Sequence, residues 1–210
     1  MLRYWNAHAC HDRISVLMPP KGQGIIRMRT SDADLLFVPD ATGPVADHWQ
    51  LRWQQKLTTA QPVAPADCDR LTRAGWLTRL AQAVGEARRP VILVGHGLGV
   101  IAIAHVTPLL EHGRIRGAFL VAPRMTAAIR SLGDVDQKLA EIPMDPLPFP
   151  SMLVASRNDA FAPFADSEDL SYAWGAAFVD AGEAGHLDTL SGHGPWPEGL
   201  MRFASFLSKL

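Results

Sequence analysis

The chain has 210 residues, which is long enough for one domain with a sizeable core. Hydrophobic residues make up 48% of it and charged residues 20%, as in ordinary soluble globular proteins. Twenty basic residues against 21 acidic ones leave a net charge of -1. Because no segment is dense in Lys and Arg, nucleic acid is not expected as a partner.

Neither a leader nor a membrane segment is expected. Polar side chains interrupt the first twenty residues, which argues against a signal peptide. The longest apolar stretch, residues 91–106, contains three glycines and a histidine before position 100 and is too short to span a bilayer. Cys10 and Cys68 lack metal-ligand spacing. We therefore expect a cytoplasmic protein with no metal and no membrane partner.

Apolar runs alternate with helical patterns along the chain, which predicts an α/β fold with a mostly parallel sheet. Buried strands are expected at residues 35–38, 91–94, 117–121, 152–155 and 177–180, with a short one at 61–64. Helices are expected at 48–57, 71–88, 98–110, 164–174 and 198–210. In the helix at 71–88, three- to four-residue spacing predicts a buried face of Leu71, Ala74, Leu77, Ala81 and Val84.

Residues 34–210 are read as one domain. Residues 1–33 fit this scheme poorly. Their apolar segments at 14–18 and 25–28 are compatible with a hairpin, and the whole stretch is equally compatible with a loosely attached extension.

A glycine-rich turn joins the strand at 91–94 to the helix that follows. A serine at position 97 would complete G-x-S-x-G, the strand–turn–helix in which a nucleophilic serine stands exposed above the sheet. The residue there is Gly97. Glycine accepts positive φ without steric cost, so it keeps the turn while removing the group that could be acylated.

The glycines of this turn are open to two other interpretations. A dinucleotide fingerprint would need a third glycine, but position 100 is Val, and no acidic residue follows Val121 at the end of the next strand. A simple tight connection would explain the glycines if the turn stood alone. The residues that follow later in the chain favour the hydrolase interpretation instead.

The order nucleophile, acid, histidine is that of an α/β hydrolase, and this chain repeats it. Asp159 follows the strand at 152–155, and His186 follows the strand at 177–180. At the carboxyl ends of parallel strands the two would meet, with Asp159 orienting His186 as the general base and acid. Taken singly, Asp159 is a good turn residue and His186 an ordinary surface histidine; Asp188 is a weaker alternative acid.

Two further histidines are not assigned to catalysis. His96 is expected to point away from the nucleophile side and to serve in packing. His193 lies in a loop rich in Gly and Pro and is read as structural.

With these motifs the sequence resembles the small single-domain serine hydrolases of the YdeN type, relatives of retinoblastoma-binding protein nine. The resemblance covers about residues 35–210. It rests on four stretches, which are residues 38–53 with their H-W-Q and a later Trp, residues 93–99 (LVGHGLG), residues 117–123 (GAFLVAP) and residues 185–199, which include GHGPWPEG.

The resemblance implies a three-layer α/β-hydrolase sandwich with five or more strands and helices on both faces. It also implies hydrolysis of small ester- or amide-like substrates without a cofactor. The catalytic positions become Gly97, Asp159 and His186. The oxyanion donors become the backbone N–H groups of Leu98 and Ala41.

Departures from the family pattern put the activity in doubt. The first loop reads Pro39-Asp40 and then Pro44-Val45-Ala46, where the family has Pro-Gly and then Ser-Gly-Pro. A carboxylate at Asp40 would repel the negative charge that an oxyanion hole stabilises. The Asp-Pro that usually follows the acid strand is also changed, since Ala160 follows Asp159.

Two explanations of Gly97 compete. An engineered Ser→Gly change would leave the distant first loop untouched, so we favour a natural pseudoenzyme. Such a protein could bind a small molecule in the old cleft or a protein partner on its surface. It could also retain slow hydrolysis by a water activated on His186.

Overall fold

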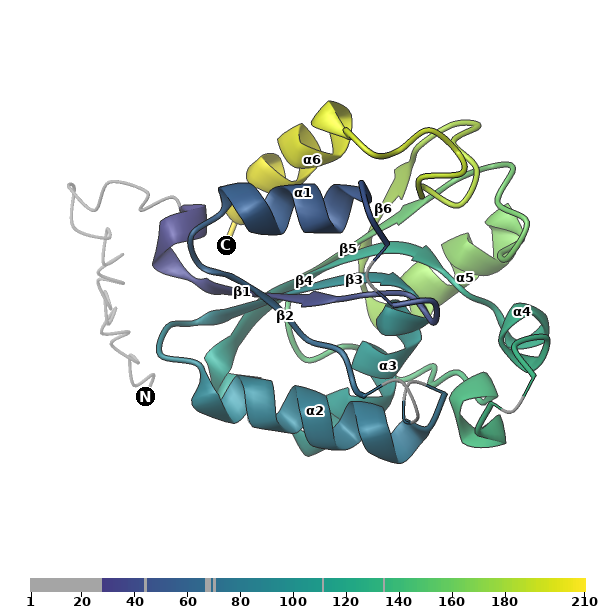
Figure 1. Cartoon of the computed structure of the whole chain (residues 1–210), viewed down its shortest axis with the longest axis horizontal. Helices are drawn as coiled ribbons and strands as arrows, with labels where there is room; N and C mark the ends of the chain where they lie inside the picture. The colour runs from purple at the N-terminus through teal and green to yellow at the C-terminus, as the bar shows by residue number, and fades with distance from the viewer. Residues whose placement is uncertain (1–27, 44, 67–68, 70, 111, 134) are drawn as a thin grey trace, which may run out of the picture.

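The computed structural model describes residues 28–43, 45–66, 69, 71–110, 112–133 and 135–210. Its centre is a six-stranded, all-parallel sheet in the order β2-β1-β3-β4-β5-β6 (Figure 1). The strands are β1 (Asp34–Val38), β2 (Ala60–Pro62), β3 (Val91–Gly97), β4 (Ile115–Pro123), β5 (Ser151–Ala155) and β6 (Ala177–Asp180). Strands β1, β3 and β5 are buried along their whole length, as continuous apolar runs in a covered parallel sheet require.

Helices cover both faces of this sheet (Figure 1). They are α1 (Trp49–Lys56), α2 (Arg73–Glu86), α3 (Leu98–Val106), α4 (Thr126–Arg130), α5 (Phe164–Trp174) and α6 (Pro197–Leu207). The apolar side chains of α2, α3 and α5 share one core cluster, and those of α1 and α6 share the other. The expected three-layer α/β-hydrolase sandwich is therefore confirmed.

The buried face of α2 overlaps the predicted one only in part. Trp76, Leu80, Ala83 and Val84 are its buried residues, whereas Ala74 and Ala81 are exposed. The helix rotates toward its bulkiest apolar side chain, because a buried Trp removes far more area from water than an alanine does. The helical spacing was right, and the predicted face was right in part, because Val84 is buried and Leu71 and Leu77 pack against the core.

Two other expectations concern the helix after β3 and the N-terminal segment. The helix expected at 98–110 stops at Val106 and continues as a 3₁₀ turn, Thr107–Leu109. The possible hairpin at 14–18 and 25–28 lies outside the described residues, except for Met28. No helix in the described part of the chain combines the length and apolar character that crossing a membrane would need.

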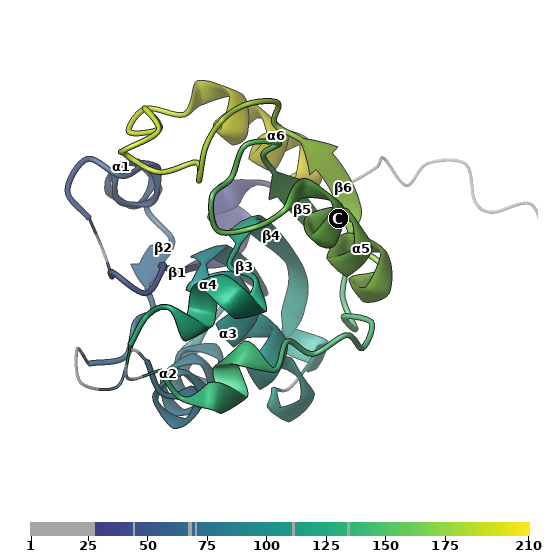
Figure 2. The same cartoon turned by 90° about the vertical axis from the view of Figure 1, so that its right-hand side faces the viewer.

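The sheet has one topological switch point, between β1 and β3. From β1 the chain continues to β2 on one side, whereas from β3 it proceeds through β4, β5 and β6 on the other. Open α/β sheets bind ligands outside the carboxyl ends of the strands at such a point. Figure 2 views the molecule from this end, where the loops that follow the strands gather.

Candidate active site

Five strand ends each supply one residue to the site. Asp40 follows β1, Gly97 ends β3, Arg124 follows β4, Asp159 follows β5 and His186 follows β6. Because all the strands are parallel, these residues meet at one edge of the sheet although they are scattered over the chain.

The turn at Gly97 has the shape of a nucleophile elbow. Gly97 has φ 56° and ψ -122°, and α3 begins at the next residue. An added Cβ at Gly97 would overlap the carboxylate of Asp40. An added Cβ at Gly99 would collide with the carbonyl oxygens of Val38 and Pro39. One glycine thus allows α3 to approach β1, and the other leaves room for a carboxylate where a nucleophile's side chain would begin.

The Asp40 carboxylate fills that room and accepts three hydrogen bonds from two groups. Its Oδ1 accepts a hydrogen bond from the backbone N–H of Leu98 at 2.7 Å. The Arg124 guanidinium donates through Nε to Oδ1 at 2.7 Å and through Nη2 to Oδ2 at 2.6 Å. Asp40 and Arg124 are only 6% and 5% exposed. Arg124 also lies over the ring of Phe161, with Cζ 3.9 Å from the centroid.

The acid and the histidine are in direct contact. Nδ1 of His186 lies 2.9 Å from Oδ2 of Asp159 and 3.1 Å from Oδ1. Leu187, the next residue, has φ 52° although it is not glycine, a strained conformation that persists only where its surroundings fix it. Its carbonyl accepts a hydrogen bond from Trp49 Nε1 at 3.0 Å. The backbone that carries His186 is therefore firmly held.

The other nitrogen of His186 faces Asp40. Nε2 is buried, has no hydrogen-bond partner among the described residues, and lies 3.7 Å from Asp40 Oδ2. Burial alone would lower the pKa of His186, but Asp159 and Asp40 outweigh it and raise that pKa to about 9. Burial would raise the pKa of Asp40, but His186 and Arg124 hold that pKa well below its usual range. At neutral pH Asp40 and His186 are thus oppositely charged, and they lie in a row between Arg124 and Asp159.

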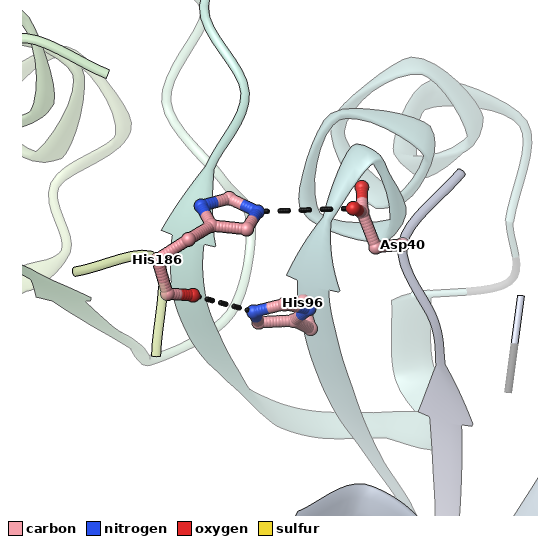
Figure 3. Close-up of side chains that lie close together, drawn as sticks. All are labelled: Asp40, His96 and His186. Carbon is pink, nitrogen blue, oxygen red and sulfur yellow. Dashed lines mark hydrogen bonds and ion pairs between the residues drawn. The ribbon is translucent and has the colours of Figure 1, made fainter. Parts of the chain in front are cut away.

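Two further histidines lie beside this row of charges. His96 Nε2 bonds to the carbonyl of His186 at 2.9 Å, and Figure 3 shows this contact together with the approach of His186 to Asp40. The rings of His96 and His48 lie 4.7 Å apart. Burial lowers the pKa of His48 to about 4 and that of His96 to about 3, so both are neutral at neutral pH.

The packing role expected for His96 fits these contacts, but its expected direction was wrong. His96 points toward the segment that carries His186, because its ring bonds that backbone across the end of β3.

A cavity of about 310 Å³ lies over the switch point. Asp40, His96 and Arg124 line its floor, and most of its wall is apolar. His186 is not among its described lining residues. The imidazole therefore lies behind Asp40 rather than on the surface that a ligand would touch.

Comparisons with known proteins agree with this geometry. Residues 35–205 match the serine hydrolase family. The chain belongs to this family. No curated protein matches the sequence.

Among solved structures, the chain is similar to YdeN-type hydrolases. A YdeN-like hydrolase from Pectobacterium atrosepticum is 30% identical, with a TM-score of 0.70 over 85% of this chain and 92% of that one. The ydeN gene product of B. subtilis is 19% identical, with a TM-score of 0.67 over 84% of this chain and 99% of that one. An esterase domain from Rhodothermus marinus, 16% identical, has a TM-score of 0.63 over 83% of this chain and 86% of that one.

Within this serine hydrolase fold, the cluster most like a metal site is already occupied by protein. Potential ligand atoms of Asp40, His96 and His186 lie within 4.8 Å of one another. However, both carboxylate oxygens of Asp40 accept from Arg124, and His96 Nε2 is bonded to a carbonyl. A cation here would have to displace a resident guanidinium, so these residues do not fit a metal.

The sequence analysis singled out Gly97, Asp159, His186 and Asp40, which the structure brings together, but it did not identify Arg124. The signal was available, since Arg124 follows a buried strand directly and Asp40, at another strand end, needs a cation if it is buried. Asp188, the alternative acid, lines the cavity and bonds Ser191 rather than His186. His193 Nδ1 lies 3.4 Å from Ser191 Oγ. The oxyanion role of the Ala41 N–H stays a prediction.

Proposed function

We propose that this member of the serine hydrolase family does not form an acyl-enzyme and instead binds a small molecule in its cleft. The observation that carries the proposal is the position of the Asp40 carboxylate. It occupies the space beside Gly97 and accepts the Leu98 N–H, the donor that would otherwise face a developing oxyanion. A substrate carbonyl oxygen cannot use a donor that is already bound to a fixed negative charge.

The state of His186 supports the same proposal. A general base must be able to accept a proton at the working pH. With its pKa raised to about 9, His186 already carries that proton at neutral pH. Since Asp40 also separates it from the cavity, activation of a water by His186 is disfavoured, in contrast to the slow hydrolysis considered from the sequence.

The ion pair favours natural divergence over a silenced enzyme. A single Ser→Gly change would leave the rest of a working site in place. Here Gly97, Asp40 and Arg124 fit one another, and Asp40 would overlap any side chain at position 97. Three mutually adjusted positions are typical of a site that has been rebuilt.

The direct test is reactivity of the unmodified protein. Fluorophosphonate probes need an activated serine, so we expect no stoichiometric labelling. We also expect no p-nitrophenyl acetate hydrolysis that depends on His186. Site-specific labelling of any serine, or turnover that His186→Ala abolishes, would overturn the proposal.

Restoring the nucleophile provides the matched test. Gly97→Ser alone should stay inactive, because the new side chain meets Asp40. Gly97→Ser combined with Asp40→Gly should show weak hydrolysis, since this change also frees the Leu98 N–H. Urea denaturation of both variants would show that they are folded. Full activity from Gly97→Ser alone would instead indicate a hydrolase silenced by one substitution.

A further inference from the structure

The cavity combines an apolar wall with one carboxylate, Asp188, that is in no ion pair among the described residues. Burial would raise the pKa of Asp188, but its hydrogen bonds from Ser191 and the charge of His186, which is not a described lining residue, lower that pKa. Asp188 is half-buried and lines the cavity. Its Oδ1 accepts from the backbone N–H of Ser191 at 2.9 Å and from Ser191 Oγ at 2.8 Å. No described Lys or Arg forms an ion pair with it. Its second oxygen accepts no hydrogen bond from a described residue.

The other ionisable groups on the lining do not compensate this charge. Arg124, the only cation among the described lining residues, donates to both oxygens of Asp40. His48 and His96 are neutral at neutral pH, because burial lowers the pKa of each. Two carboxylates and one guanidinium leave the lining with a net charge of -1.

The rest of the wall would take a hydrocarbon group. It includes Phe37, Val45, Leu51, Phe161 and Leu190. Leu190 is 95% exposed, so it stands at the mouth of the cavity beside Asp188. A volume of about 310 Å³ is at the lower end of the range for small-molecule sites, roughly 300–1,000 Å³.

We infer that the ligand of this cavity is a small organic cation, with its ammonium group at Asp188 and its hydrocarbon part against the apolar wall. This inference rests on the proposed function, and it adds the chemical class of the ligand. A carboxylate ligand of the same size would meet Asp188 and find Arg124 already paired. A neutral ligand would gain the apolar contacts but form no ion pair with Asp188.

The test compares three probes of equal chain length, which are hexylammonium, hexanol and hexanoate, titrated at pH 7 and low salt. Amide chemical shifts of residues 48–54 and 188–190 locate binding in the cavity. We expect hexylammonium to bind up to about fivefold more tightly than hexanol, as an ion pair at a half-buried carboxylate would give. Hexanoate should bind most weakly. Added NaCl should weaken the binding of hexylammonium alone.

A pair of variants separates the cavity charge from general attraction to an acidic protein. Asp188→Asn should reduce hexylammonium to the affinity of hexanol, while hexanol binding stays unchanged and shows that the cavity is intact. Asp145→Asn makes the same charge change at an exposed site outside the cavity lining and should alter nothing.

The outcomes separate this inference from the proposed function. Equal or tighter binding of hexanol or hexanoate would overturn the inference, as would an ammonium preference that survives in Asp188→Asn. Either result would leave the absence of acyl-enzyme chemistry standing. Fluorophosphonate labelling would overturn the proposed function whichever probe binds best.

Discussion

The two sides of the site differ in what they retain of a serine hydrolase. On the side of β5 and β6, Asp159 and His186 keep the contact that orients a catalytic imidazole. On the side of β1, β3 and β4, Gly97 stands at the turn where we propose that the nucleophile has been lost, and a buried ion pair occupies the space beside it.

This difference supports the proposal that the side of β1, β3 and β4 has been refilled rather than simply lost. Asp40 brings a negative charge to the Leu98 N–H and to His186, the two groups that would otherwise face the oxyanion and the nucleophile. Asp40 is therefore an electrostatic partner, inside the protein, for the pair formed by His186 and Asp159. The contacts that stabilise this rebuilt arrangement can be removed one at a time.

The largest effect should come from removing the cation of the rebuilt side. Arg124→Ala removes the cation that donates to both oxygens of the buried Asp40 and leaves that carboxylate with only the Leu98 N–H and the more distant His186. Breaking a buried pair in this way costs about 3–5 kcal/mol of stability. Urea denaturation measures the free energy of unfolding. Arg157→Ala is the matched control, because its ion pair with Asp180 is largely exposed, and it should cost far less.

A double variant shows whether the cost belongs to the unpaired charge. Asp40→Ala combined with Arg124→Leu should be more stable than Arg124→Ala alone, since neither charge is then left buried. Equal losses in the two proteins would mean that Arg124 contributes through packing on Phe161 instead.

The next largest effect should come from adding a side chain at position 97. Gly97→Ser combines a positive φ with overlap against Asp40, and strain together with a lost hydrogen bond to a charged group should cost about 3 kcal/mol. Gly175→Ser is the control, since Gly175 also has positive φ (65°) but open space around it. If both serines destabilise the protein equally, the overlap with Asp40 is not real.

Stability should also depend on pH in a way that distinguishes the two sides. Despite burial, Asp159 and Asp40 raise the pKa of His186 to about 9 from 6.5. The folded protein holds this proton more tightly than the unfolded chain, so the stabilisation is complete below about pH 6.5 and is lost as the pH rises toward 9. We expect a loss of about 2 kcal/mol over this window in urea denaturation.

His48 and His96 act in the opposite direction. Burial lowers their pKa values to about 4 and 3, so the unfolded chain takes up protons below about pH 6.5 that the folded protein does not. Stability should therefore be highest near pH 6.5. His186→Gln should flatten only the alkaline side of the profile. A wild-type protein that becomes more stable between pH 7 and 9 would contradict the charged state of His186.

The two sides also differ in how much the sequence could predict. Asp159 and His186 follow from chain order and strand ends, because a parallel sheet brings such positions together. The pairing of Asp40 with Arg124 joins residues 84 positions apart, and no spacing rule links them. From the sequence, Asp40 was expected to harm an oxyanion hole. Its neutralisation by Arg124 could not be predicted, because it depends on the register of β1 against β3 and of β3 against β4. The face of α2 was predicted only in part for a similar reason, since packing decides between neighbouring apolar faces.

The smallest expected effect tests whether the groups that hold the Asp40 carboxylate can bind a free anion in its place. Asp40→Ala should leave the Leu98 N–H and the Arg124 guanidinium directed at an empty volume of carboxylate size. Formate matches the deleted group, so it should bind there and stabilise the variant. At ten times its dissociation constant the gain would be about 1.4 kcal/mol. Thermal unfolding with increasing formate measures it.

Three comparisons make the formate result specific to this site. Formamide has the same shape without the charge, so it should not stabilise Asp40→Ala. Wild-type protein should not respond to formate, because Asp40 already fills the volume beside Gly97. Asp40→Ala combined with Arg124→Leu should lose the response, since the cation that holds the anion is gone. An equal response in all these proteins would show only a general salt effect, and Asp40 would then not be the occupant of a former oxyanion site.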